Sequence, residues 1–153
     1  MAATKSTKNA TSYEGFSAEE RAAMKDHAQE MKKTARRSTK TAAADGEKDV
    51  QDKIAEMSGT DKDLAEAVHA LVKKHAPTLT PRTYYGMPAY AIDGKPVLFF
   101  KPAGKFKMRY ATLEFSDKAK LDDGPMWPMG FALLEITPAV EKRIIALIKQ
   151  AAG

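Results

Sequence analysis

Residues 82–115 read RTYYGMPAYAIDGKPVLFFKPAGKFKMRYATLEF, and this stretch decides the fold. Apolar and polar side chains alternate through much of it with a period of two, as in strands that bury one face. Asp93-Gly94 is a strong signal for a tight hairpin turn, and Ala103-Gly104 marks a second turn. The stretch predicts a β-meander with strands near residues 88–92, 96–101 and 106–115, followed by a further strand at 131–136.

Helical patterns flank the meander. Apolar residues recur at helical spacing in residues 47–57, and Thr60 is placed to cap a second helix that ends before Pro77. Thr137-Pro138 begins a last helix that runs to about residue 150. Helices, then strands, then a helix predict an α+β fold, in which an antiparallel sheet of four to five strands has helices packed on one face.

The N-terminal part of the chain has a different composition. Residues 1–49 contain no Leu, Ile or Val, so they cannot bury enough apolar surface to fold alone. We expect residues 1–15 to be a disordered tail and residues 16–46 to be a helical extension and linker. Ser17 and Glu20 form a capping box for a helix over residues 17–38. This helix is expected to lean on the domain through four side chains: Met24, Ala28, Met31 and Ala35.

Composition excludes several classes of protein. The chain has 153 residues, a net charge of +5 and no cysteine, so disulfides, thiolate metal sites and a cysteine nucleophile are excluded. No apolar run approaches the roughly 18 residues of a membrane helix, and the N-terminus lacks the apolar segment of a secretory signal. Zinc, nucleophile and phosphate-loop motifs are also missing. The sequence therefore predicts a cytoplasmic protein that is not an enzyme and has no membrane partner.

The segment Tyr85-Gly86-Met87-Pro88-Ala89-Tyr90, with the meander after it and the Thr-Pro helix at 137–150, resembles the YdhG-like family. This is a bacterial domain family of unknown function, and the resemblance covers residues 47–152. It implies a YdhG-like domain over residues 47–153, with helices packed on a curved sheet. The helix that begins near Phe16 is similar to an extension in one branch of the family. Members are often described as frataxin-like iron chaperones, which implies ferrous iron as a ligand.

Acidic residues gather between positions 45 and 66. Those at positions 49, 52 and 56 share one face of a helix and can hold a hard cation weakly. The candidate metal ligands are Asp49, Asp52, Glu56, Asp61 and Asp63. The same acids also suit helix N-termini and pairing with neighbouring lysines, and we favour that explanation. No histidine lies at a ligand spacing, so no cofactor is firmly implied and only weak iron binding is expected.

A basic stripe crosses the expected strand at 106–115. Lys105, Lys107 and Arg109 alternate with apolar residues, so we expect them to project from one sheet face, with Lys101 on the neighbouring strand. Such a face can bind an anion, or single-stranded nucleic acid by stacking. The aromatic pattern of RNA-binding sheets is missing, which disfavours nucleic acid. An ordinary solvated face is the favoured alternative.

An aromatic cluster around the Gly-x-Pro element either lines a pocket or belongs to the core, and the two interpretations are equally good. With the stripe, it gives the candidate ligand-binding residues Tyr85, Met87, Pro88, Tyr90, Lys101, Lys107, Arg109 and Trp127. The leading hypothesis is a protein that handles a small ligand or ferrous iron. The alternative is an interaction module that binds an acidic protein or nucleic acid through its basic helix and sheet face.

Overall fold

The computed structural model describes residues 15–36 and 41–153, and these residues have the predicted α+β fold. Five strands form one antiparallel sheet in the order β1-β2-β3-β4-β5. They are β1 (Thr80–Tyr84), β2 (Met87–Ile92), β3 (Lys95–Lys101), β4 (Ala111–Phe115) and β5 (Gly130–Leu133). The helices in the described residues are α2 (Ala18–Arg36), α3 (Ala42–Ala55), α4 (Gly59–His75), α5 (Ala103–Phe106) and α6 (Pro138–Ala152).

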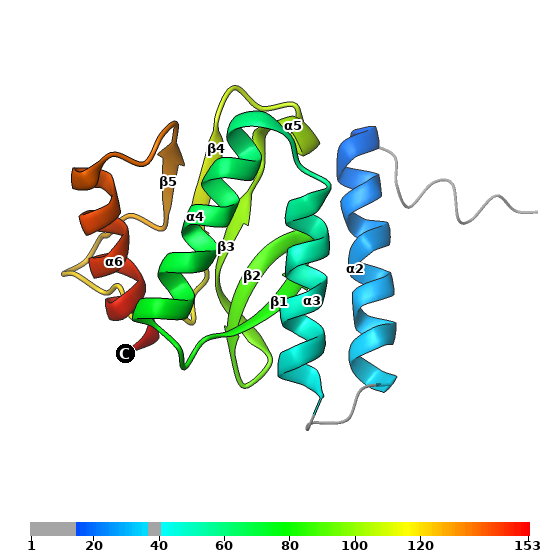
Figure 1. The fold of residues 1–153 in the computed structure, drawn as a ribbon, viewed down its shortest axis with the longest axis horizontal. Helices are drawn as coiled ribbons and strands as arrows, with labels where there is room; N and C mark the ends of the chain where they lie inside the picture. The colour runs from blue at the N-terminus through cyan, green and yellow to red at the C-terminus, as the bar shows by residue number, and fades with distance from the viewer. Residues whose placement is uncertain (1–14, 37–40) are drawn as a thin grey trace, which may run out of the picture.

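One face of the sheet carries the hydrophobic core. Leu98 and Phe100 of β3 are fully buried there, together with Val68 of α4 and Ile148 of α6. Val50 brings α3 into the same cluster. Helices α3 and α4 lie across this face, α6 lies near β5, and α2 lies beside α3 at the β1 end (Figure 1). The predicted antiparallel sheet, with the domain helices α3, α4 and α6 packed on one face, is therefore confirmed.

Two local signals in the sequence form the structures they predict. Asp93 and Gly94 have positive φ values of 52° and 76°, and they join Ile92 directly to its partner Lys95 in the hairpin of β2 and β3. The Thr137 hydroxyl accepts a hydrogen bond of 3.2 Å from the Val140 N–H and so caps α6. These two points fix where the meander turns and where the last helix begins.

The strand expected over residues 106–115 is wrong in its first half. Residues 103–106 form the one-turn helix α5, Lys107 is left-handed with φ of 51°, and β4 begins only at Ala111. The Asp61 carboxylate accepts hydrogen bonds from the N–H groups of Ala103 at 3.0 Å and Gly104 at 2.8 Å, which turns the chain out of the sheet. The basic stripe of Lys105, Lys107 and Arg109 therefore does not lie on one sheet face.

Several boundaries differ from the prediction at the N-terminal side of the sheet. Helix α3 begins at Ala42, inside the expected linker, and α4 follows the N-cap Ser58 instead of Thr60. Strand β1 was not predicted because it contains Pro81, which an edge strand tolerates. Strand β5 ends at Leu133 instead of residue 136. The expected tail at 1–14 and linker residues 39–40 lie outside the described residues.

Helix α2 confirms the Ser17 half of its expected capping box, but not most of its expected apolar contacts. The Ser17 hydroxyl accepts a hydrogen bond of 3.1 Å from the Glu20 N–H. Ala28 and Met31 are exposed, whereas Ala23 and Glu30 are buried, and Met24 is only half-buried. The side chain of Ala35 lies outside the described part of the chain. Helix α2 therefore meets the domain through a different and more polar face than its apolar residues suggested.

Candidate functional site

A large hollow lies between the β5 end of the sheet and α6. We call it the β5–α6 groove, and its volume is about 520 Å³. Apolar side chains from both sides form most of its lining: Leu113, Phe131, Leu133, Val140, Ile144 and Leu147. Polar groups are contributed by Arg109, Tyr110, Glu135, Thr137 and Arg143. A mostly apolar hollow of this size with a few polar groups is the usual form of a small-ligand site.

The groove forms because only one side of α6 packs against the core, which leaves apolar residues on its other side uncovered. Ile144 and Ile148 face the core, and the Thr137 cap sets where the helix begins. Strand β5 has four residues and is the last strand of the sheet. Leu134, directly after β5, is 70% exposed, so the end of the groove is open to solvent. An amphipathic helix over a short edge strand therefore leaves apolar surface uncovered.

Two arginines bring positive charge to this apolar surface. The guanidinium carbon of Arg143 lies 5.1 Å from the centre of the Phe131 ring, and that of Arg109 lies 5.1 Å from the Tyr110 ring. A guanidinium held on a ring face keeps its N–H donors available at the edge of its plane. Both arginines are otherwise exposed. The groove can therefore offer apolar contact and charge-assisted hydrogen bonds to one ligand.

The structure separates the predicted ligand-binding residues. Tyr85, Met87 and Lys101 line a smaller groove beneath α2, which we call the α2 groove, with a volume of about 300 Å³. Arg109 belongs to the β5–α6 groove, and Lys107 pairs with Glu19 at 2.7 Å. The others are part of the packed domain: Pro88 and Tyr90 are fully buried, and Trp127 packs against the core cluster.

Tyr90 belongs to a buried hydrogen-bond network. Its hydroxyl lies 2.9 Å from Nδ1 of His69, and Nε2 of His69 lies 2.8 Å from the Glu47 carboxylate. Burial opposes ionisation of Glu47, but hydrogen bonds from His69, Lys73 and Gln51 hold its pKa at about 2. Burial, with the charge of Glu47, raises the pKa of the Tyr90 hydroxyl. The network joins α3, α4 and β2, and its groups satisfy one another, as expected for a structural element.

The candidate metal ligands are also distributed among other contacts. Asp61 caps α5, Asp52 pairs with Lys48 at 3.9 Å, and Glu56 pairs with Lys53 at 3.5 Å. Asp49, Asp52 and Glu56 do line one small cleft between α2 and α3, which also contains Lys33 and Lys53. Asp63 is exposed. Within the described residues, no group of three or more acidic or histidine side chains is arranged to hold a metal ion.

Iron binding on this surface stays a prediction. Titration of ferrous iron without oxygen, followed in an amide NMR spectrum, is expected to broaden signals of α3 if the cleft takes the metal. Replacing Asp49, Asp52 and Glu56 by their amides should then remove the broadening. Broadening that survives these changes would place any iron elsewhere on the molecule.

The arginine and aromatic residue that make the β5–α6 groove distinctive, Arg143 and Phe131, were missed by the sequence interpretation. Phe131 stands in the predicted strand and Arg143 on the predicted helix, but the pairing of the two elements is a long-range contact. One signal was available: a cation and an aromatic residue on two elements that are expected to pack can form a cation–π pair.

Comparison with protein-family models, with curated proteins and with solved structures gives no match for this chain. The resemblance to the YdhG-like family therefore stays a prediction. Among the residues that the structure describes, no helix has the combination of length and apolar character needed to span a membrane.

Proposed function

We propose that the protein binds a small amphiphilic anion, an apolar chain or ring that ends in a carboxylate, in the β5–α6 groove. The observation that carries the proposal is that Arg109 and Arg143 line an apolar groove of about 520 Å³. The proposal is one of binding, in keeping with a sequence that offers no catalytic motif. The YdhG-like resemblance supports no particular ligand for this groove.

The chemistry of the lining favours a ligand with two parts. Contact with Phe131, Ile144 and Leu147 removes apolar ligand surface from water, which is favourable by roughly 25 cal/mol per Å². A carboxylate can accept two parallel hydrogen bonds from one guanidinium. Glu135 also lines the groove and would repel a second anionic group there. A ligand with one anionic end and one apolar end therefore fits better than a highly charged one.

Arg143→Gln is expected to weaken binding of decanoate about tenfold, because charge-assisted hydrogen bonds contribute roughly 1.5–3 kcal/mol when they are made. Isothermal titration calorimetry of the full chain measures the change. Lys142→Gln is the matched control, since Lys142 is the exposed neighbour on α6 and does not line the groove. It removes the same charge from the same helix and should leave decanoate affinity unchanged.

Decanol provides the complementary test, because it has a similar apolar chain and no charge. Its affinity should be the same for Arg143→Gln and for the unchanged protein. Equal loss of decanoate affinity in Arg143→Gln and Lys142→Gln would mean that only general electrostatic attraction is involved. Decanoate binding that is unaffected by Arg143→Gln would contradict the proposed site.

A further inference from the structure

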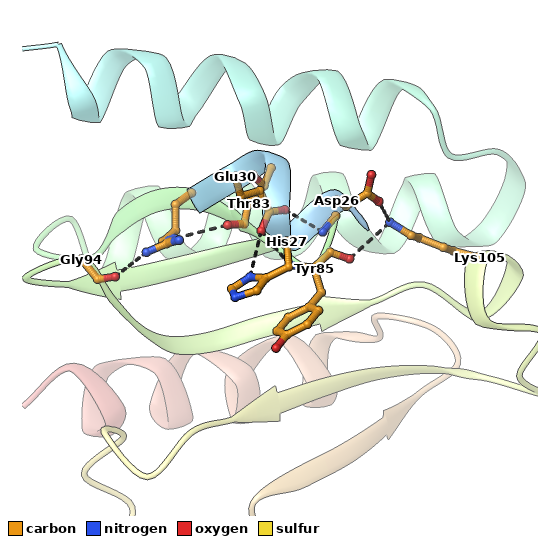
Figure 2. Close-up of polar contacts among 9 residues, drawn as sticks. Asp26, His27, Glu30, Thr83, Tyr85, Gly94 and Lys105 are labelled. Atoms are coloured by element: carbon orange, nitrogen blue, oxygen red, sulfur yellow. Dashed lines mark hydrogen bonds and ion pairs between the residues drawn. The ribbon is translucent and has the colours of Figure 1, made fainter. Parts of the chain in front are cut away.

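Helix α2 is attached to the rest of the protein by three acidic side chains on one face. Glu19 pairs with Lys107 at 2.7 Å, and Asp26 pairs with Lys105 at 2.8 Å. Glu30 accepts hydrogen bonds from the N–H groups of Tyr85 at 2.9 Å and Gly86 at 2.7 Å. Positions 19, 26 and 30 are separated by seven and four residues, so they lie on one side of the helix. Figure 2 shows the contacts of Asp26 and Glu30 around the Tyr85-Gly86 turn.

The turn between β1 and β2 is shaped to receive a carboxylate. Tyr85 and Gly86 both have positive φ, at 51° and 74°, and their consecutive N–H groups bind the two oxygens of the same Glu30 side chain. Consecutive backbone N–H groups in such a conformation form an anion-binding concavity. The ammonium group of Lys105 also donates to the Tyr85 carbonyl at 3.3 Å, so a positive charge is held beside the turn.

Helix α2 buries few of its side chains against the domain beneath it. Among its residues with described side chains, only Ala23 and Glu30 are buried, and none belongs to the core cluster. The α2 groove remains open between the helix and Phe99 and Lys101 of β3. The His27 ring stacks on Tyr85 with 4.1 Å between ring centres, and its Nδ1 lies 3.6 Å from the Glu30 carboxylate, beyond hydrogen-bond distance.

The surface beneath α2 combines aromatic rings with cations. Tyr85, Phe99 and Phe106 line the α2 groove with Lys101, and the ammonium group of Lys101 lies 4.8 Å from the Phe106 ring. Lys105 and Lys107 stand on either side of Phe106 in the sequence, and both pair with carboxylates of α2. Since the core does not include α2, removal of this helix would expose a basic and aromatic surface on an otherwise intact domain.

We propose that this surface, made by the Tyr85-Gly86 turn, Lys101, Lys105, Phe106 and Lys107, is a docking site for an acidic helix of a partner protein, and that α2 occupies it in cis. Charge complementarity identifies the class of partner, since all three polar anchors bind carboxylates. The three α2 carboxylates at positions 19, 26 and 30 extend over roughly 16 Å along the helix axis, the rise of eleven residues of α-helix. A nucleic acid would also bring negative charge, but the turn holds both oxygens of a single planar carboxylate. Displacement requires only that the partner helix bind more favourably than α2 does.

A labelled peptide with the sequence of residues 17–36 is the probe for this site, and fluorescence anisotropy measures its binding to the full chain. The variant Glu19→Gln/Asp26→Asn/Glu30→Gln weakens cis docking, so it is expected to bind the peptide at least about tenfold more tightly than the unchanged protein. The control protein Asp63→Asn/Asp122→Asn/Asp123→Asn has the same change of charge at exposed positions away from α2 and should bind like the unchanged protein. A peptide that carries the three α2 substitutions should not bind.

Equal peptide affinity for the variant and the unchanged protein would overturn the proposal. Saturable binding of single-stranded oligothymidine to the variant, without peptide binding, would assign the surface to nucleic acid instead. A concentration-dependent dimer of the unchanged protein that the peptide dissociates would assign it to a second copy of the chain. Hydrogen exchange of the unchanged protein gives a test independent of the variant, because α2 amides should exchange faster than those of α4. Equal protection of the two helices would contradict a displaceable α2.

Discussion

Gly46→Ala is expected to lower the free energy of unfolding by about 3 kcal/mol, which is the upper end of the usual cost of overpacking. Gly46 is a buried residue within α3, and a methyl group added to it would overlap the backbone carbonyl oxygen of Pro81 in β1. That oxygen belongs to the main chain of a paired strand, so it cannot move without shifting β1 or α3. Urea denaturation monitored by circular dichroism measures the effect.

The expected loss of stability is opposite in sign to the effect that helix propensity alone predicts. Glycine to alanine within a helix normally stabilises by about 1 kcal/mol because alanine has the higher helix propensity. Ala43→Gly, at an exposed position in the first turn of the same helix, is the control and should destabilise through propensity alone, by up to about that amount. If Gly46→Ala stabilised the protein, α3 would not lie as close to β1 as the structure places it.

Glu47→Ala is expected to lower the free energy of unfolding by about 2 kcal/mol, because it leaves the buried Nε2 of His69 and the ammonium group of Lys73 without their acceptor. Glu47→Gln keeps a hydrogen-bond acceptor and should cost less. Thermal or urea unfolding at neutral pH distinguishes the two variants. An alanine variant as stable as the unchanged protein would show that this network contributes nothing to folding.

The same residue predicts how stability depends on pH. The pKa of Glu47 is held at about 2 in the folded protein, below its ordinary value of 4.5. A lowered carboxyl pKa stabilises the fold above the ordinary pKa, and this contribution disappears as the pH falls from 4.5 towards 2. The difference in stability between the unchanged protein and Glu47→Gln should therefore shrink over this range. A difference that stays constant would contradict the low pKa.

Local patterns in the sequence predicted the parts of the fold that local chemistry decides. Asp93-Gly94 specified its hairpin because two consecutive residues with positive φ suit that pair, and Thr137-Pro138 specified the start of α6. The sequence did not reveal α5, because its formation depends on Asp61, which lies about forty residues earlier in the chain. The α+β class followed from the order of the elements, which the alternation of helical and strand periods made clear.

The candidate sites were harder to predict than the fold. The predicted ligand-binding residues lie on two faces of the sheet because side chains alternate along a strand. Tyr90 faces the core, whereas Met87 and Lys101 line the α2 groove. The charges of α2 gave no local indication of their partners, since Glu30 binds backbone groups that lie more than fifty residues away in the chain. The β5–α6 groove required knowledge of which elements are neighbours, which no periodicity contains.

The two edges of the sheet have different consequences for self-assembly. Helix α3 lies so close to the β1 main chain that only glycine fits at position 46, whereas β5 pairs with β4 alone among the described strands. A sheet grows into a fibre only when each molecule offers two complementary free edges. Helix α3 obstructs the β1 main chain at Pro81, so we expect pairing through β5 to end with two copies back to back, because the second edge of each copy is hindered. The close approach of a single helix to β1 thereby limits strand-to-strand growth to a pair.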